Sequence, residues 1–248
     1  MCRHLGYVGP PVSVGEMLGA GTHSLVRQSW APKEMRGGGT INADGFGVAW
    51  RSSGRWSRYR SAQPLWSDPA VPEVLADVAS GSIVAAVRSA TEGMPVERSA
   101  TAPFVGDGWA FSHNGVVRGW PDTLAPLASE LPVADLLRLE SPTDSATLWQ
   151  LLRHALGVQT PEAAVTALVT TVAREAPGSR LNLLLSGGDE LWATAWDHAL
   201  YARVDDTSAL IASEPLDDSD GWQPVPDRHL VGARPGHLIL TPLEMGDP

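Results

Sequence analysis

The feature that most constrains the fold is a change of hydrophobic periodicity along the chain. Residues 143–156 and 160–175 carry apolar side chains at helical spacing, and each range begins with a small polar capping residue. Short β-rich runs precede and follow this pair, and helices are also expected at 14–29 and 69–79. The predicted strands are 3–8, 46–50, 83–87, 109–112, 181–185, 190–196, 200–204, 209–212 and 237–240. Strands, two adjacent helices and more strands predict a layered α+β domain.

Length and composition indicate one globular domain. The chain has 248 residues, 43% of them hydrophobic, and it shows neither a linker nor an internal repeat, so residues 1–248 are predicted to form a single domain. It has no apolar run long enough to cross a bilayer, and its first residues lack the profile of a signal peptide. Its single cysteine excludes an internal disulfide and fits a reducing compartment, so we expect a cytoplasmic protein without a membrane partner.

Charge and histidine spacing narrow the expected ligands. The net charge of −10 argues against nucleic acid as a partner and is compatible with a small-molecule substrate. The seven histidines show no paired metal-ligand spacing, and no Walker-type loop or nucleotide fingerprint is present. The sequence therefore predicts neither a metal nor another cofactor, and it leaves the oligomeric state open.

The single cysteine, Cys2, directly follows the initiator Met1. The small side chain of Cys2 favours removal of Met1. The mature chain would then begin at Cys2 and carry both a thiol and a free α-amine. The amine, with an ordinary pKa of about 8, can take the thiol proton directly or through a water. The pairing can thus act as a nucleophile with its own base. The alternative is that a small residue simply follows the start codon.

Two further features could hold a charged substrate. The segment Asn42-Ala43-Asp44-Gly45-Phe46-Gly47 is typical of a turn that enters a strand. Arg88 ends a predicted buried strand, with Thr91 three residues later. A planar guanidinium there suits a carboxylate held by two hydrogen bonds, to which a hydroxyl adds a third. A structural salt bridge is an equally good interpretation of Arg88.

The segment His113-Asn114-Gly115 and the residue Asp144 complete the set of candidates. An Asn amide and a Gly backbone N–H can aim two donors at one point, which is what an oxyanion hole requires, although Asn-Gly is also a common hairpin turn. Asp144 lies near a predicted helix start, where a carboxylate could bind a substrate ammonium, cap the helix, or do both with different oxygens.

Taken in order along the chain, these segments resemble the class II glutamine amidotransferases, which are N-terminal-nucleophile enzymes. The resemblance implies a four-layer αββα sandwich, with Cys2 as the nucleophile and its α-amine as the general base. It implies an oxyanion hole formed by Asn114 and Gly115. It further implies a site for a glutamyl group in which Arg88 and Thr91 bind the α-carboxylate, Asp144 binds the α-ammonium, and His113 contributes to substrate binding.

The C-terminal part favours one branch of this family. Residues 213–218, with Trp222, 225–226 and 231–240, are similar to a short stand-alone branch whose members remove glutamate from γ-glutamyl-hercynylcysteine sulfoxide in ergothioneine biosynthesis. We therefore expect an amidohydrolase that acts on linear amides through a Cys2 thioester. The alternatives are a glutaminase subunit that supplies ammonia to a separate synthase, and a silent module that binds γ-glutamyl compounds.

The tryptophan content bears on the leaving group. In this branch the leaving group carries a trimethylammonium and an imidazole, and aromatic faces attract such a permanent cation. The chain has ten tryptophans against three phenylalanines and three tyrosines, and most are expected to lie in the core. Four lie in or beside predicted loops and strand ends and are candidates for a cation contact: Trp30, Trp50, Trp66 and Trp120.

Overall fold

The computed structural model describes residues 2–34 and 41–244, and its backbone forms two antiparallel sheets. The first sheet has the strand order β11-β9-β10-β1-β4-β2-β3, and the second has the order β13-β12-β8-β7-β6-β5. Their bounds are β1 Arg3–Ser13, β2 Phe46–Ser52, β3 Arg55–Ser61, β4 Ala79–Val87, β5 Phe104–Gly106, β6 Trp109–Val116, β7 Arg180–Ser186, β8 Leu191–Ala195, β9 Tyr201–Val204, β10 Ala209–Ala212, β11 Gln223–Pro224, β12 His229–Arg234 and β13 His237–Pro242.

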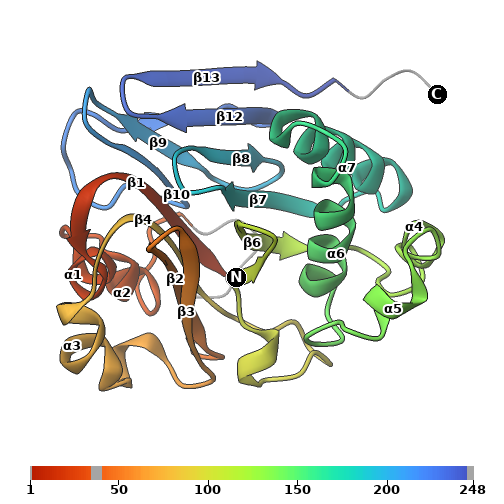
Figure 1. Ribbon diagram of the computed structural model, residues 1–248, viewed down its shortest axis with the longest axis horizontal. Helices are drawn as coiled ribbons and strands as arrows, with labels where there is room; N and C mark the ends of the chain where they lie inside the picture. Colours follow the sequence, from red (N-terminus) through yellow and green to blue (C-terminus); the bar gives the residue numbers. More distant parts are fainter. Residues whose placement is uncertain (1, 35–40, 245–248) are drawn as a thin grey trace.

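Helices cover the outer faces of both sheets (Figure 1). The helices are α1 Val14–Gly19, α2 Leu25–Gln28, α3 Ala70–Glu73, α4 Ala125–Ala128, α5 Val133–Leu136, α6 Asp144–Leu156 and α7 Pro161–Glu175. One apolar cluster packs α1 and α2 on the first sheet, a second lies between the sheets, and a third packs α6 and α7 on the second sheet. Three apolar clusters between four layers make the αββα sandwich that the family resemblance implies.

The two long helices have the bounds that their caps predict. The side chain of Thr143 accepts a hydrogen bond from the backbone N–H of Ala146 at the start of α6, and Thr160 accepts one from Ala163 at the start of α7. Such caps satisfy backbone donors that the helix itself cannot pair. Periodicity and capping chemistry agree here, and both helices follow the sequence pattern from end to end.

The two other predicted helices are wrong in extent. The range 14–29 forms two short helices, because Gly21 has φ +80° and a side chain there would strike the carbonyl oxygen of Leu216. The range 69–79 contains α3 and a 3-10 turn at Leu75–Asp77. In both cases a tertiary contact or a tight turn interrupts the apolar spacing that suggested one helix.

The predicted turn at residues 113–115 is also wrong, because these residues continue β6. His113, Asn114 and Gly115 pair in register with residues 183, 182 and 181 of β7. Glycine is required at position 115, since a Cβ there would collide with the carbonyl oxygen of Arg180. The Asn-Gly pair therefore reflects a close approach between strands and not a change of chain direction.

The strand β3 carries no clear sequence signal. It pairs with β2 at the edge of its sheet and contains Arg55, Arg58 and Arg60 among seven residues. Charged side chains are typical of edge strands and hide the strand pattern. Among the described residues, no helix is both long and apolar enough to cross a membrane.

Candidate active site

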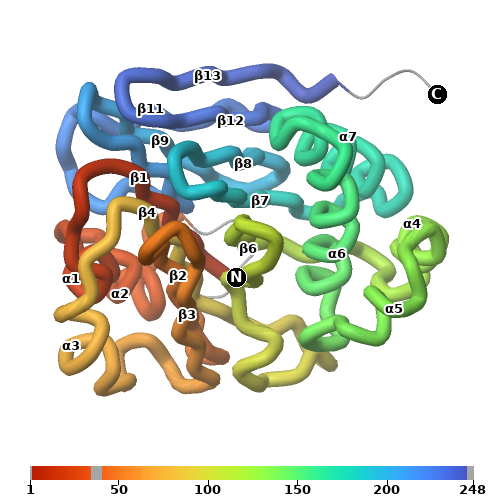
Figure 2. Tube along the Cα trace, viewed as in Figure 1, coloured from red at the N-terminus to blue at the C-terminus, as the bar shows by residue number. Residues whose placement is uncertain are grey.

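Six of the seven predicted site residues line one small cavity. The backbone that carries these residues includes the start of β1 and the strand β6, which lie side by side near the middle of the view in Figure 2. The walls of the cavity include Cys2, Arg88, Thr91, His113, Gly115 and Asp144. The free volume of about 30 Å³ suits one or two waters.

Cys2 directly precedes the central strand β1. Its neighbour Arg3 pairs with Val87 of β4, and β1 lies between β4 and β10 in the first sheet. The thiol Sγ lies 3.6 Å from the carbonyl oxygen of Ser89, and the residue is half-buried. A central strand anchored on both sides thus holds the thiol at the cavity wall.

The Asn42–Gly47 segment positions Arg88. The backbone N–H of Asp44 donates to the carbonyl of Arg88 at 3.0 Å, and the N–H of Arg88 donates to the carbonyl of Gly45 at 2.8 Å. A carboxylate oxygen of Asp44 also accepts the N–H of Ala90 at 2.7 Å. The buried guanidinium uses one N–H on the carbonyl of Pro95, at 2.7 Å, and retains further donors.

His113 is held at both ring nitrogens. Its Nε2 lies 3.0 Å from the carbonyl oxygen of Arg180, and its Nδ1 lies 2.9 Å from the hydroxyl of Ser145. Because a carbonyl only accepts, Nε2 carries the proton of its contact, and the Ser145 hydroxyl lies between Nδ1 of the ring and Oδ1 of Asp144, which is 3.2 Å away. The ring therefore forms a fixed part of the cavity wall.

Asp144 is the first residue of α6, and Thr143 is the capping residue. One carboxylate oxygen of Asp144 accepts the backbone N–H of Val117 at 2.9 Å, and the other accepts the N–H of Ser145 at 2.7 Å. The carboxylate is thus fixed at a helix N-terminus while it lines the cavity. The first of these oxygens accepts one hydrogen bond and keeps a lone pair that can accept from a cation, whereas the second also accepts from the Ser145 hydroxyl at 3.2 Å.

Asn114 is the predicted site residue that does not line the cavity. Strand side chains alternate between faces, so Asn114 points to the opposite side of β6 from His113. It is fully buried, and its Nδ2 donates to the hydroxyl of Ser213 at 3.1 Å. Its Oδ1 has no hydrogen-bond partner among the described residues.

The sequence did not predict the buried polar layer that Arg3, His4 and His198 form behind Cys2. The Arg3 guanidinium contacts the carbonyl of Glu34, and its Nη1 lies 3.2 Å from the Nε2 of His198. Burial lowers the pKa of Arg3, and the nearby carboxylate of Glu214 opposes that shift. Burial also lowers the pKa of His4 to about 3, with His198 adding to the effect, so the His4 ring is neutral at neutral pH. The only sequence signal for this layer was the C-terminal segment that begins at residue 213.

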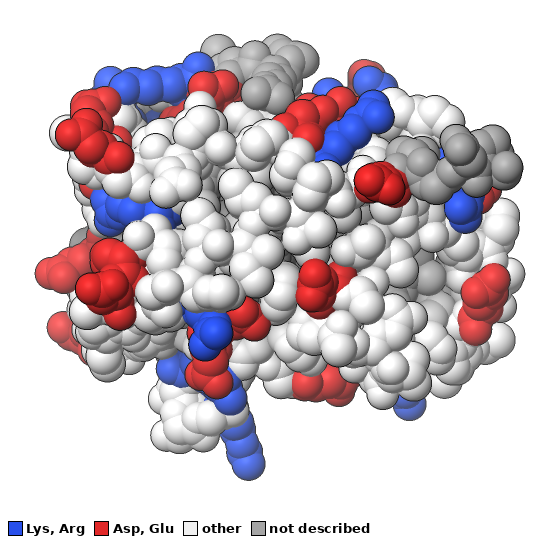
Figure 3. All heavy atoms as spheres, turned by 90° about the horizontal axis from the view of Figure 1, so that it is seen from above, with Lys and Arg blue, Asp and Glu red and all other residues white. Residues whose placement is uncertain are grey.

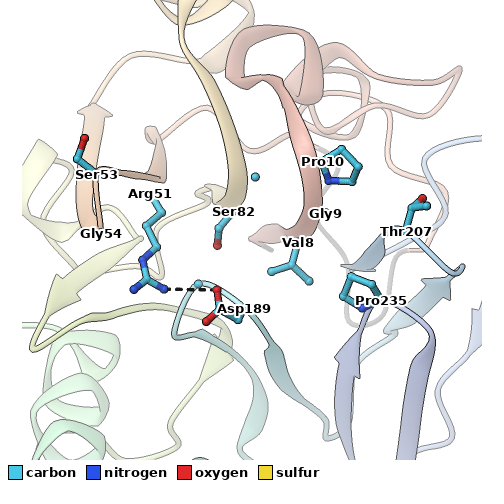
Figure 4. A pocket seen from close by; sticks show the side chains of 12 residues that line it. Val8, Gly9, Pro10, Arg51, Ser53, Gly54, Ser82, Asp189, Thr207 and Pro235 are labelled. Carbon is cyan, nitrogen blue, oxygen red and sulfur yellow. Dashed lines mark ion pairs between the residues drawn. The ribbon is translucent and has the colours of Figure 1, made fainter.

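A larger hollow lies beside the middle of β1, lined by Val8 and Gly9 among others, with a volume of about 660 Å³ (Figure 4). Val8 is six residue steps along extended chain from Cys2, which corresponds to about 20 Å. Arg51 and Asp189 approach to 3.8 Å across this hollow. None of the predicted site residues lines it.

On the face shown in Figure 3, acidic and basic side chains are scattered in small groups among uncharged atoms.

The fold and the cavity define the class of protein. Two packed antiparallel sheets with helices outside them, and a cysteine at the start of a central strand, are the architecture of an N-terminal-nucleophile hydrolase. The sequence profile of the class II glutamine amidotransferases matches residues 17–204. The chain belongs to this family.

Relatives and solved structures agree with this assignment. The chain is 38% identical over 245 residues to the γ-glutamyl-hercynylcysteine sulfoxide hydrolase of Mycolicibacterium smegmatis, covering 98% of this chain and 100% of the relative. It is 39% identical to the protein of that name from Mycobacterium tuberculosis, covering 98% and 97%.

Among solved structures, a class II domain protein from Silicibacter pomeroyi matches with a TM-score of 0.70 at 21% identity, over 98% of this chain and 99% of that one. An allosteric regulatory enzyme of purine biosynthesis matches with a TM-score of 0.73 at 15% identity, over 98% of this chain and 49% of its own. These two likenesses support the fold alone.

Proposed function

We propose that this protein is an amidohydrolase that cleaves the γ-glutamyl amide bond of γ-glutamyl-hercynylcysteine sulfoxide and releases glutamate. The observation that carries the proposal is the full-length match to hydrolases of that name. The match covers 98% of this chain and 97–100% of each relative. The purine-biosynthesis enzyme, in contrast, extends well beyond the half that this chain matches.

The reaction proceeds through a thioester on Cys2. After Met1 is removed, the α-amine of Cys2 takes the thiol proton, and Sγ attacks the γ-carbonyl carbon. The tetrahedral oxyanion accepts hydrogen bonds from the backbone N–H of Gly115 and from the amide of Asn114. The C–N bond then breaks, and the leaving amine takes the proton from the α-ammonium. Water, deprotonated by the same amine, attacks the thioester and releases glutamate and the thiol.

The cavity walls supply the groups that a glutamyl end requires. Arg88 and Thr91 bind the α-carboxylate, and Asp144 binds the α-ammonium. Both nitrogens of His113 are already hydrogen-bonded. His113 therefore contacts the substrate through its ring and keeps the wall rigid.

A matched pair of substrates tests the role of Asp144. Asp144→Asn should lower kcat/KM by about 10- to 100-fold, because a hydrogen bond between charged groups is worth about 1.5–3 kcal/mol. On the corresponding glutaryl amide, which lacks the α-amine, wild type and variant should agree within about three-fold, since the lost interaction is already absent. An equal loss on both substrates would show that Asp144 acts only by holding Val117 and Ser145.

Two exposed tryptophans are the best candidates for the leaving side. Trp50 and Trp120 pack against the apolar clusters, and the Nε1 of Trp120 also donates to the hydroxyl of Thr147. Trp30 and Trp66 are 38% and 42% exposed and meet edge to face, with ring centroids 5.7 Å apart. Exposed ring faces are the ones that remain available to a trimethylammonium group.

The decisive experiment for the proposed function compares two substrates under the same conditions. The kcat/KM for γ-glutamyl-hercynylcysteine sulfoxide should exceed that for free glutamine by about 10²-fold or more, which is about 2.7 kcal/mol of differential transition-state binding. Chromatographic assay of released glutamate measures both values. Equal efficiencies would favour the second candidate function, a glutaminase that supplies ammonia to a separate synthase, as in other members of its family.

A further inference from the structure

We propose that Ser213 is a positioning residue, which fixes the amide of Asn114 relative to the nucleophile strand and thereby sets the geometry of the oxyanion hole. The proposal rests on the function proposed above and adds to it a residue outside the cavity wall. Ser213 follows β10 directly and is fully buried. It lies more than two hundred residues from Cys2 in the chain, at the end of a strand that pairs with β1.

The Ser213 hydroxyl connects three points of the structure. It accepts the Nδ2 of Asn114 at 3.1 Å and the backbone N–H of His4 at 3.0 Å. It also lies 3.4 Å from the carbonyl oxygen of His4, to which it donates, and the backbone N–H of Ser213 donates to that same carbonyl at 3.1 Å. Because His4 lies on β1 two residues after Cys2, one hydroxyl links the strand that follows the nucleophile to the Asn114 side chain.

This link crosses between the two sheets. Asn114 belongs to β6 in the second sheet, and β10 and β1 belong to the first. The terminal torsion of an asparagine side chain has a broad energy profile, so packing and partners decide where its N–H groups point. The Oδ1 of Asn114 has no partner among the described residues, and Ser213 is the side chain that binds its Nδ2. Without the hydroxyl, the amide can rotate about this torsion.

An oxyanion hole depends on donors that are in place before the charge develops. One N–H of Asn114 binds Ser213, and the second is then directed by the plane of the amide. A displacement of the order of 1 Å in such a group can cost about 10²-fold in rate. Ser213 is thus expected to affect the chemical step through Asn114 and to leave substrate binding almost unchanged.

The test is a double-mutant cycle measured on both γ-glutamyl-hercynylcysteine sulfoxide and glutamine. Ser213→Ala should lower kcat by about 10- to 100-fold with KM changed less than about three-fold. In the Asn114→Ala background the same substitution should have little further effect, because the group on which it acts is gone. Multiplicative effects in the double variant would show that Ser213 acts independently of Asn114 and would overturn the proposal.

Ser112→Ala is the matched control. Ser112 lies on β6 two residues before Asn114, is equally buried, and its hydroxyl has no partner among the described residues. This variant should keep the kcat of the wild type, and thermal unfolding of all variants checks that each is folded. A wild-type kcat in folded Ser213→Ala would also overturn the proposal. Activity on glutamine alone would refute the leaving group proposed above, yet the cycle would still report on Ser213.

Discussion

Cys2→Ala should reduce turnover by at least about 10⁴-fold, because no other side chain can form the thioester. The variant should remain folded, since Cys2 is half-buried just before β1 and its thiol makes one long contact among the described residues, to the carbonyl oxygen of Ser89. Cys2→Ser should leave at most a trace of activity, because an alcohol ionises far less readily than a thiol. Glutamate release and thermal unfolding measure the two effects separately.

The single cysteine makes this result easy to verify. Iodoacetamide should add one carbamidomethyl group to the wild type, none to Cys2→Ala, and should abolish activity in proportion to labelling. Intact mass should show that active enzyme lacks Met1, because the α-amine of Cys2 must be free to act as the base. Full activity in a protein with a residue fused before Cys2 would rule out this mechanism.

Asn114→Ala should lower kcat by about 10²- to 10³-fold with little change in KM, which is the pattern of a contact made chiefly in the transition state. In the proposed site Arg88, Thr91 and Asp144 bind the glutamyl end and Asn114 does not, so its loss should leave ground-state binding of the glutamyl group intact. Steady-state kinetics on the sulfoxide substrate measure both constants.

Asn182→Ala provides the comparison within the same sheet. Asn182 is the register partner of Asn114 on β7, and its side chain binds the carbonyls of His198 and Ala199 and the N–H of Trp196. Its loss leaves buried backbone groups without partners, so it should lower thermal stability far more than kcat. If Asn114→Ala changed stability in the same way and left kcat intact, Asn114 would be a structural residue.

The sequence by itself determined the layers and the order of the site segments. The helices α6 and α7 were predictable because helical spacing and a capping threonine agree at each start. The family resemblance implied seven site residues, and six of them meet in one cavity although they lie as far apart as Cys2 and Asp144. Such predictions succeed where local chemistry and the global fold favour the same structure.

Tertiary structure alone decided the local conformation at several of these segments. Residues 113–115 have the composition of a turn, but pairing with β7 holds them in a strand, where Gly115 admits the carbonyl of Arg180. The Asn42–Gly47 segment was typical of any strand entry, and only its hydrogen bonds to Arg88 and Ala90 reveal a positioning role. Propensity yields to such contacts because a buried backbone group left without a partner costs more than an unfavourable local preference.

Only the tertiary structure determined which residues form the polar layer behind Cys2. Ser213 and Glu214 come next to His4 and Arg3 because β10 pairs with β1 across about two hundred residues of chain. No periodicity in the sequence records which strands become neighbours in a sheet, since pairing depends on the packing of the whole sandwich. The sequence therefore indicated most of the residues that line the small cavity, and the packing of the two sheets determined which residues hold them in place.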